Sequence, residues 1–255
     1  MPTDPMETPR VIEVVPGVFV RSAVDNMAWI DLGGQALVVD ALEQPELADE
    51  VLADIARTLP DIPVRTVLNT HTHHDHVALN RAFEQRCGAE IVNQDVAPLP
   101  SDGRVFEGTR TRLVMLPMGG THTEGDAVVW LERDRVLLVG DIFGYGLIPL
   151  IRPLDDASAQ LVRQVYRRLI AFDAAVVVPG HGPVCTAGEL VRWLTYFDWL
   201  IDQARVMVRK GSGDDQIIQQ LAPPRDMRSW WRFVQWKHED SVRRVIQALR
   251  RGNLR

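Results

Sequence analysis

The sequence has few cysteines and no apolar segment of the length that targeting or membrane insertion needs. Cys87 and Cys185 are its only two thiols in 255 residues, which excludes a disulfide framework and favours a reducing compartment. The polar N-terminus lacks the apolar core of a secretory signal, and no stretch approaches the length of a membrane span. We therefore expect a cytoplasmic protein without membrane contact.

The chain also lacks an excess of positive charge. Its formal net charge is −6, so no basic field is available for a phosphate backbone, and nucleic acid is not an expected partner. Apolar residues make up 46% of the chain, enough for a sizeable core. This length fits one large domain or two small ones. A small-molecule substrate is the partner that these properties favour.

Histidine, by contrast, is concentrated in one place. Residues 71–76 spell His-Thr-His-His-Asp-His and follow an apolar, β-branched run that predicts a buried strand. Functional loops commonly begin where such strands end. Imidazole nitrogens and carboxylate oxygens suit zinc and similar metals. The alternation lets His71 and His73 face one ion, with Asp75 and His76 placed for a second.

Three further candidate ligands occur at the ends of other strand-like runs. His122, Asp141 and His181 each follow an apolar run, and each has glycines close by that allow the backbone to approach closely. One such residue alone is usually part of a turn. Three of them at three strand ends predict a shared site.

Together these elements resemble the metallo-β-lactamase superfamily of metal-dependent hydrolases. The resemblance covers roughly residues 10–185 and rests on His71-x-His73-x-Asp75-His76, His122, Gly140-Asp141 and Pro179-Gly180-His181-Gly182, in the family's order. It implies an α/β fold, a four-layer αββα metallo-β-lactamase-type sandwich with two metals at one end of the sheets. It also implies a first metal held by His71, His73 and His122, a second held by Asp75, His76 and His181, and Asp141 as the bridge. Residues 1–210 would form the hydrolase domain, and residues 211–255 a helical extension packed on it.

The ligand set predicts a hydrolase with two Zn²⁺ per chain, although manganese, iron or cobalt would also accept these ligands. A bridging hydroxide would attack an ester-type bond (a lactone, thioester or aryl ester, or a phosphoester), since metals lower the pKa of water to about 7. Asp75 would ligate, orient the nucleophile and relay its proton. Two alternatives stay open: a mononuclear-iron persulfide dioxygenase-like oxidoreductase, and a non-catalytic accessory or binding protein. Metal analysis separates them as two zinc, one iron or none.

Other polar residues are expected to have structural roles. Asp40 ends a predicted strand, where capping a turn or helix is preferred to a catalytic role. His238 lies on a predicted helix with a surface position as the default, and His74 occupies the variable, solvated or supporting position of the motif. Cys185 is expected to fill a small apolar space.

The loop after Asp141 contains the candidate substrate-binding residues Phe143 and Tyr145. Lactonases of the superfamily carry a tyrosine shortly after the bridging aspartate, and Tyr145 is similarly placed. A tyrosine packed inside the loop is the alternative. The chain is also similar to glyoxalase II at residues 69–71, but its C-terminal part has no convincing basic cluster for glutathione.

Residues 11–40 predict four strands, and residues 45–59 and 155–172 predict amphipathic helices. Residues 96–110 are expected to form an irregular loop beside a pocket. The chain after residue 185 predicts helices, with aromatic residues crowded on two of them. These aromatics either form core or form a cap in which Trp230 and Trp231 bind an apolar part of the substrate. A subunit interface, and hence a homodimer, is the third alternative.

Overall fold

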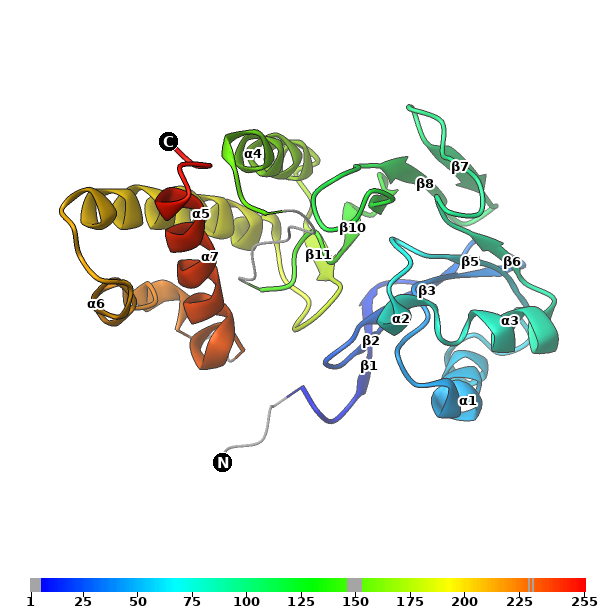
Figure 1. Cartoon of the computed structure of the whole chain (residues 1–255). Coiled ribbons are helices and arrows are strands. Elements are labelled where there is room, and N and C mark those ends of the chain that lie inside the picture. Colours follow the sequence, from blue (N-terminus) through cyan, green and yellow to red (C-terminus); the bar gives the residue numbers. More distant parts are fainter. Residues whose placement is uncertain (1–5, 146–152, 229, 231) are drawn as a thin grey trace.

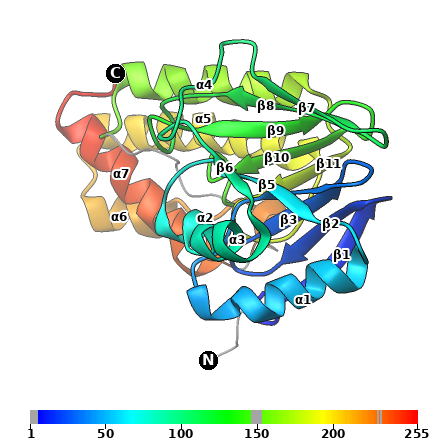
Figure 2. The same cartoon turned by 90° about the vertical axis from the view of Figure 1, so that its right-hand side faces the viewer.

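The computed structural model describes residues 6–145, 153–228, 230 and 232–255, and all structural statements refer to these residues. Two β-sheets lie face to face, and helices cover their outer surfaces (Figure 1). The predicted αββα sandwich is confirmed. Figure 2 shows the same layers after a quarter turn, with α1 below the first sheet and α4 above the second.

The first sheet has six strands in sequence order. They are β1 (Arg10–Val15), β2 (Val18–Ser22), β3 (Met27–Asp31), β4 (Ala36–Val39), β5 (Val64–Leu68) and β6 (Glu90–Val92). The first four pair antiparallel, which confirms the strands predicted within residues 11–40, and β5 and β6 join in parallel. Since parallel neighbours end at the same edge, the residues that follow β4 and β5 meet there.

The second sheet has five strands in the order β11-β10-β9-β8-β7. They are β7 (Arg104–Glu107), β8 (Arg112–Pro117), β9 (Ala127–Leu131), β10 (Val136–Gly140) and β11 (Val176–Pro179). The pairs β7–β8, β8–β9 and β9–β10 are antiparallel, whereas β10 and β11 are parallel. The carboxyl ends of β10 and β11 therefore also share one edge.

The prediction of an irregular loop at residues 96–110 is wrong for its last part, because β7 forms an edge strand there. β7 has two apolar residues between charged ends, and Val105 is 46% exposed. An edge strand needs only one paired side and one buried face. Because β7 is short and half-exposed, its sequence has no apolar run from which a strand could be predicted.

Helices α1 (Ala48–Thr58), α2 (His74–Val77) and α3 (Asn80–Cys87) lie on the side of the first sheet. A 3₁₀ turn (Pro45–Leu47) precedes α1. Val51 and Ile55 of α1 pack with Trp29 and Val38 of the sheet, as the predicted amphipathic helix requires. A separate core lies between the two sheets and includes Val20, Ile30, Leu113 and Val129.

The second sheet is covered by α4 (Asp156–Ala171), α5 (Ala187–Arg209) and α7 (His238–Arg250). Between α5 and α7 lie α6 (Asp214–Gln220), a 3₁₀ turn (Arg225–Met227) and a π-helical turn (Phe233–Lys237). Asp155 begins α4 with a reciprocal capping box to Ser158. The boundary predicted at residue 210 falls in the turn after α5, and the division into a hydrolase domain and a helical extension packed on it stays a prediction.

Most of the C-terminal aromatic residues form core. Trp193, Phe197 and Phe233 are fully buried, and the Trp193 ring stacks on Tyr166 with centroids 4.2 Å apart. The surface position expected for His238 is wrong, because its side chain is 6% exposed and its Nδ1 lies 3.0 Å from the Tyr196 hydroxyl. No helix in the described part of the chain is both long and apolar enough to cross a membrane.

Candidate metal centre

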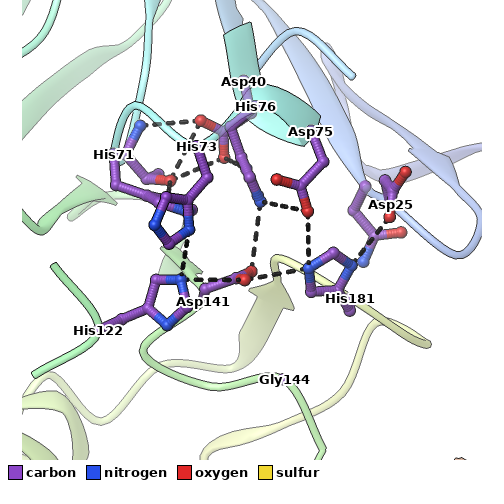
Figure 3. A network of polar contacts seen from close by, with 12 residues as sticks. Asp25, Asp40, His71, His73, Asp75, His76, His122, Asp141, Gly144 and His181 are labelled. Atoms are coloured by element: carbon purple, nitrogen blue, oxygen red, sulfur yellow. Dashed lines mark hydrogen bonds and ion pairs between the residues drawn. The ribbon is translucent and has the colours of Figure 1, made fainter. Parts of the chain in front are cut away.

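All seven predicted ligands meet at one edge of the sandwich (Figure 3). His71 and His73 lie in the turn after β5, Asp75 and His76 on α2, and His122 in the β8–β9 loop. Asp141 directly follows β10, and His181 follows β11. Both sheets therefore contribute to the site.

The first cluster consists of His71, His73 and His122, whose ligand atoms all lie within 4.8 Å of one another. The rings meet edge to face with centroids 4.6 to 4.8 Å apart. His122 Nε2 lies 2.9 Å from His73 Nδ1, and His71 Nε2 is buried without a hydrogen-bond partner. Three imidazole nitrogens that converge in this way can hold one cation.

The second cluster consists of Asp75, His76, Asp141 and His181. His181 Nε2 lies 3.0 Å from Asp141 Oδ2 and 3.3 Å from Asp75 Oδ2, and His76 Nε2 lies 3.3 Å from Asp141 Oδ1. Asp141 Oδ2 is also 3.4 Å from His122 Nε2 of the first cluster. Asp141 thus faces both clusters, which is the position that a bridging ligand requires.

Two glycines make room for this arrangement. A Cβ on Gly180 would lie 2.0 Å from Asp141 Oδ1, and a Cβ on Gly140 would lie 2.3 Å from the Thr70 hydroxyl oxygen. Gly140 also has a φ of +50°, in the left-handed region that favours glycine. The glycines of the Gly140-Asp141 and Gly180-His181 pairs are therefore required sterically.

Asp40 is a functional residue that the sequence analysis missed, and the capping role expected for it is wrong. Its buried carboxylate accepts hydrogen bonds from the Thr70 backbone N–H at 2.8 Å and the Thr70 hydroxyl at 2.9 Å. Because that hydroxyl has one proton and gives it to Asp40, it accepts from His71 Nδ1 at 3.2 Å. Asp40 Oδ2 also lies 3.1 Å from His76 Nδ1. One carboxylate thus orients a histidine in each cluster and leaves each Nε2 free for a metal.

Two other aspartates hold the remaining histidines. Asp25 Oδ1 lies 2.9 Å from His181 Nδ1, so the Nε2 of that ring faces Asp141. Asp126 accepts hydrogen bonds from the backbone N–H groups of His122 and Thr123, both at 2.7 Å, and so fixes the β8–β9 loop. The run of threonine, glycine and aspartate around His122 gave a local signal for Asp126. Asp25 had none, because only the fold brings it to His181.

The charges of the clusters follow from burial and from their neighbours. Burial lowers the pKa of His71 to about 2, so this imidazole is neutral and ready to ligate. The hydrogen bond from His181 lowers the pKa of Asp75 to about 2. Burial opposes the charge on His76, but the carboxylates of Asp40 and Asp141 outweigh it and raise that pKa to about 10. The second cluster therefore holds protons that metal ions would displace.

The residues present fit a pair of metal ions. His71 Nε2 is buried without a hydrogen-bond partner, and the buried His76 Nε2 and Asp141 Oδ1 face each other at 3.3 Å. Buried polar atoms are rarely left unpaired, so ligand atoms that converge in this way fit a bound cation. Imidazole and carboxylate ligands in these numbers suit zinc and its first-row neighbours.

Three of the predicted substrate-binding residues, Phe143, Tyr145 and Trp230, form a buried aromatic group. Phe143 is fully buried and Tyr145 is 7% exposed, with its ring packed on Gly182. The Trp230 ring, 6% exposed, meets Tyr145 edge to face at 4.7 Å. The rings of Phe143, Tyr145 and Trp230 pack on one another, and their roles in substrate binding stay predictions. Trp231 lies outside the described residues.

The family model of the metallo-beta-lactamase superfamily matches residues 24–98 and 89–181. The chain is 26% identical over 197 residues to 2,4-dinitroanisole O-demethylase subunit alpha of Nocardioides sp. (strain JS1661), covering 71% of this chain and 57% of that protein. It is 32% identical over 121 residues to a hydroxyacylglutathione hydrolase of Methylococcus capsulatus, covering 44% and 45%. It thus spans about half the length of these curated relatives. A metallo-beta-lactamase structure from Pontibacter korlensis superposes with a TM-score of 0.63 and 21% identity, covering 74% of this chain and 98% of that one.

Proposed function

The chain belongs to the metallo-beta-lactamase superfamily, and from that premise we propose that it is a dinuclear-metal hydrolase that cleaves an ester-type bond. One observation carries the proposal: two complete clusters lie next to each other, and Asp141 Oδ2 is 3.0 Å from His181 Nε2 of the second and 3.4 Å from His122 Nε2 of the first. An oxidoreductase with one metal ion would not require the second cluster of ligands, and a non-catalytic protein would require neither cluster. The similarity to a hydroxyacylglutathione hydrolase supports hydrolysis of a thioester or related ester.

We assign the first ion to His71, His73 and His122, and the second to Asp75, His76 and His181, with Asp141 between them. Two bound zinc ions would supply Lewis acidity, which polarises the scissile bond and acidifies water. Manganese, iron or cobalt would fit the same ligands.

The protein's own residues orient the reactants and move protons. Asp75 has an ionised carboxylate whose side chain is 28% exposed, so it faces both the second cluster and solvent. It is therefore placed to orient a water molecule and to accept its proton at a carboxylate oxygen. Asp40 and Asp25 hold the His76 and His181 rings, so the ligands need no reorganisation when substrate arrives.

The test combines metal analysis with a hydrolase panel. Zinc-loaded protein should contain two metal ions per chain and hydrolyse at least one class among lactones, thioesters, aryl esters and phosphoesters. The Asp141→Asn variant should lose metal and activity together. One iron per chain, or an inactive protein with both metals bound, would overturn the proposal.

A second candidate activity is hydrolysis of an aryl methyl ether, in which water and the ether would give a phenol and methanol. The relative with 71% coverage of this chain is an O-demethylase subunit, and bound metal ions would supply the Lewis acidity and the activated water for this reaction. Adding 2,4-dinitroanisole to the panel tests it, with release of 2,4-dinitrophenol as the positive result.

A further inference from the structure

The first metal-binding cluster is assembled from two loops that come from different sheets. His71 and His73 follow β5 of the first sheet, whereas His122 lies in the loop between β8 and β9 of the second sheet. Figure 3 shows the rings of His73 and His122 facing each other from these two loops. The geometry of this cluster therefore depends on what holds the two loops together.

A short turn at residues 93–96, directly after β6, contacts both loops. On one side, the hydroxyl of Thr72, which lies between two of the ligands, donates a hydrogen bond to Asp95 Oδ2. On the other side, Gln94 Nε2 donates a hydrogen bond to the backbone carbonyl of Asp126 at 3.0 Å. Asp126 is the residue whose carboxylate fixes the β8–β9 loop. Two neighbouring side chains of the turn thus bind one ligand loop each.

The turn also lies close to the backbone of the β8–β9 loop. A Cβ built on Gly125 would lie 3.4 Å from both Asp95 Oδ1 and Gln94 Cβ, which is the distance of van der Waals contact. At the base of the same two loops, the Ala127 N–H donates a hydrogen bond to the Thr70 carbonyl at 2.8 Å. The two ligand loops are therefore joined at their base by the backbone and further out by the turn.

A buried amide network fixes the turn to the first sheet. Asn69 and Asn93 are 0% and 4% exposed. Asn93 Nδ2 donates to Asn69 Oδ1, and Asn93 Oδ1 accepts from the Asp95 N–H, both at 3.1 Å. Asn69 also exchanges hydrogen bonds with Asn80 of α3 and donates to the His76 carbonyl at 2.8 Å. Because a fully satisfied buried network is rigid, the turn presents Asp95 from a fixed position.

The contact between Thr72 and Asp95 is poorly suited to stabilise the fold as a whole. Both residues are exposed, and substitutions at exposed positions change folding stability little. Partners that hold the ligands of a metal in place, by contrast, have large effects on metal affinity. The position of this contact, beside His73 and opposite His122, favours the second role.

We propose that Gln94 and Asp95 are positioning residues of the first metal site. They hold the loop of His73 and the loop of His122 at the separation that one shared ion requires. This inference rests on the proposed dinuclear metal site, because a chain that binds no first ion has no need for this separation. Neither residue is a metal ligand in this assignment, so their effect on the ion passes through the two loops.

The test measures zinc affinity at one site at a time, by competition with a chromophoric chelator. A His181→Ala background weakens the second site, and a His73→Ala background weakens the first. Asp95→Ala should lower the affinity of the first site about tenfold, the lower end of the range for partners that orient metal ligands. It should leave the affinity of the second site unchanged. Gln94→Ala should have the same selective effect, since it releases the other loop.

Four further variants separate positioning from a general effect on the fold. Thr72→Val removes the donor and should match Asp95→Ala, and the double variant should lose no more than either single one. Asp95→Asn and Thr72→Ser keep the hydrogen bond and should restore the wild-type affinity. Glu90→Ala is the matched control, because Glu90 of β6 pairs at 3.0 Å with Arg104 of β7 and so joins the two sheets at the surface. It should leave both affinities unchanged. Equal losses at both sites, or an unchanged first site in both Asp95→Ala and Gln94→Ala, would overturn the proposal.

A second readout follows the geometry of the site instead of its affinity. Protein loaded with ¹¹³Cd should give two NMR signals, assigned with the same two backgrounds. Asp95→Ala should shift the first-site signal and leave the second-site signal in place. Denaturant unfolding of the metal-free proteins should give similar midpoints for Asp95→Ala and Glu90→Ala. A lower midpoint for Asp95→Ala together with unmoved cadmium signals would assign Asp95 to the fold and overturn the proposal.

The positioning role and the hydrolase function fail in different ways. A selective loss at the first site, in a protein that binds two ions but hydrolyses no ester of the panel, supports the positioning role and argues against the hydrolase. Hydrolysis with two bound ions, unaltered at the first site in Asp95→Ala and Gln94→Ala, supports the hydrolase and overturns the positioning role.

Discussion

The Asp40→Asn substitution should weaken metal binding at both clusters, although Asp40 is not itself a predicted ligand. Its carboxylate is 4% exposed and faces three donors, which are the Thr70 backbone N–H, the Thr70 hydroxyl and His76 Nδ1. An asparagine amide has one accepting oxygen and one donating nitrogen. At least one of the three donors would therefore face another donor.

The magnitude follows from these contacts. A buried donor left unpaired costs about 1–3 kcal/mol of folding stability. Loss of a carboxylate that orients a metal-binding histidine lowers metal affinity by about 10–100-fold. Because Asp40 holds His76 directly and His71 through Thr70, we expect the loss at each of the two ions.

Asp31→Asn provides the matched control. Asp31 is also a buried carboxylate at a strand end, where it accepts a hydrogen bond from the Gly33 N–H at 2.7 Å and pairs with Arg110 at 2.8 Å. It lies outside the network that joins the clusters, so its substitution should lower stability without changing metal affinity. The measurements are metals per chain, dissociation constants by competition with a chromophoric chelator, and denaturant unfolding of the metal-free proteins. If Asp40→Asn bound both metals as tightly as the wild type while losing stability as Asp31→Asn does, Asp40 would serve the fold alone.

Three other predictions concern the ligands and the aromatic core. His71→Ala should bind one metal ion instead of two and lose hydrolysis while the fold persists; full activity with both ions retained would contradict the assignment. Because neighbouring carboxylates outweigh burial and raise the pKa of His76 to about 10, metal binding near pH 7.5 should release protons, measurable by calorimetry in buffers of different ionisation enthalpy. The raised pKa of His76 also stabilises the metal-free fold, fully below pH 6.5 and less as the pH rises through about 10. Denaturant unfolding without metal at several pH values measures whether the stability falls in this range. Trp230→Ala should lower stability by about 3–5 kcal/mol as an emptied core site, whereas the exposed Trp236→Ala should change it by less than about 0.5 kcal/mol; equal effects on unfolding would refute the burial argument.

The ligand residues were predictable because their signal is local. Four of them lie within residues 71–76, and His122, Asp141 and His181 each follow an apolar strand. Strand ends in a two-sheet fold converge at an edge, so spacing along the chain translates into proximity in space. The sandwich itself was predicted from the resemblance that these ligand motifs carry, and the strand and helix patterns agreed with it.

The supporting residues were hidden because their partners are distant in sequence. An aspartate at the end of a strand has the same local pattern whether it caps a turn or holds a metal-binding histidine. Asp40 directly follows β4, and Asp25 lies in the loop between β2 and β3. Only the folded chain brings their carboxylates to the rings of His76 and His181.

Aromatic crowding alone could not distinguish a substrate cap from a core. A stripe at helical spacing has the same pattern whether it packs on a sheet or lines a pocket. Trp193 of α5 and Phe233 of the π-helical turn are fully buried in the core that α4, α5 and α7 form with the second sheet. Only the contacts between these helices decide whether the aromatic residues form core or line a pocket. Such contacts join residues that are distant in the sequence, so the local pattern does not predict them.

The metal centre is held ready at some expense to the stability of the metal-free protein. His71 Nε2 is buried without a hydrogen-bond partner, and a buried polar atom left unpaired costs about 1–3 kcal/mol. The sandwich tolerates this because the ligands belong to both sheets, whose packing fixes their backbones, and because Asp40 and Asp25 fix their rings. Metal ions would recover this cost and join the sheets at one edge. Metal binding should therefore stabilise the whole sandwich, because ligands on two sheets cannot separate while they hold the same pair of ions.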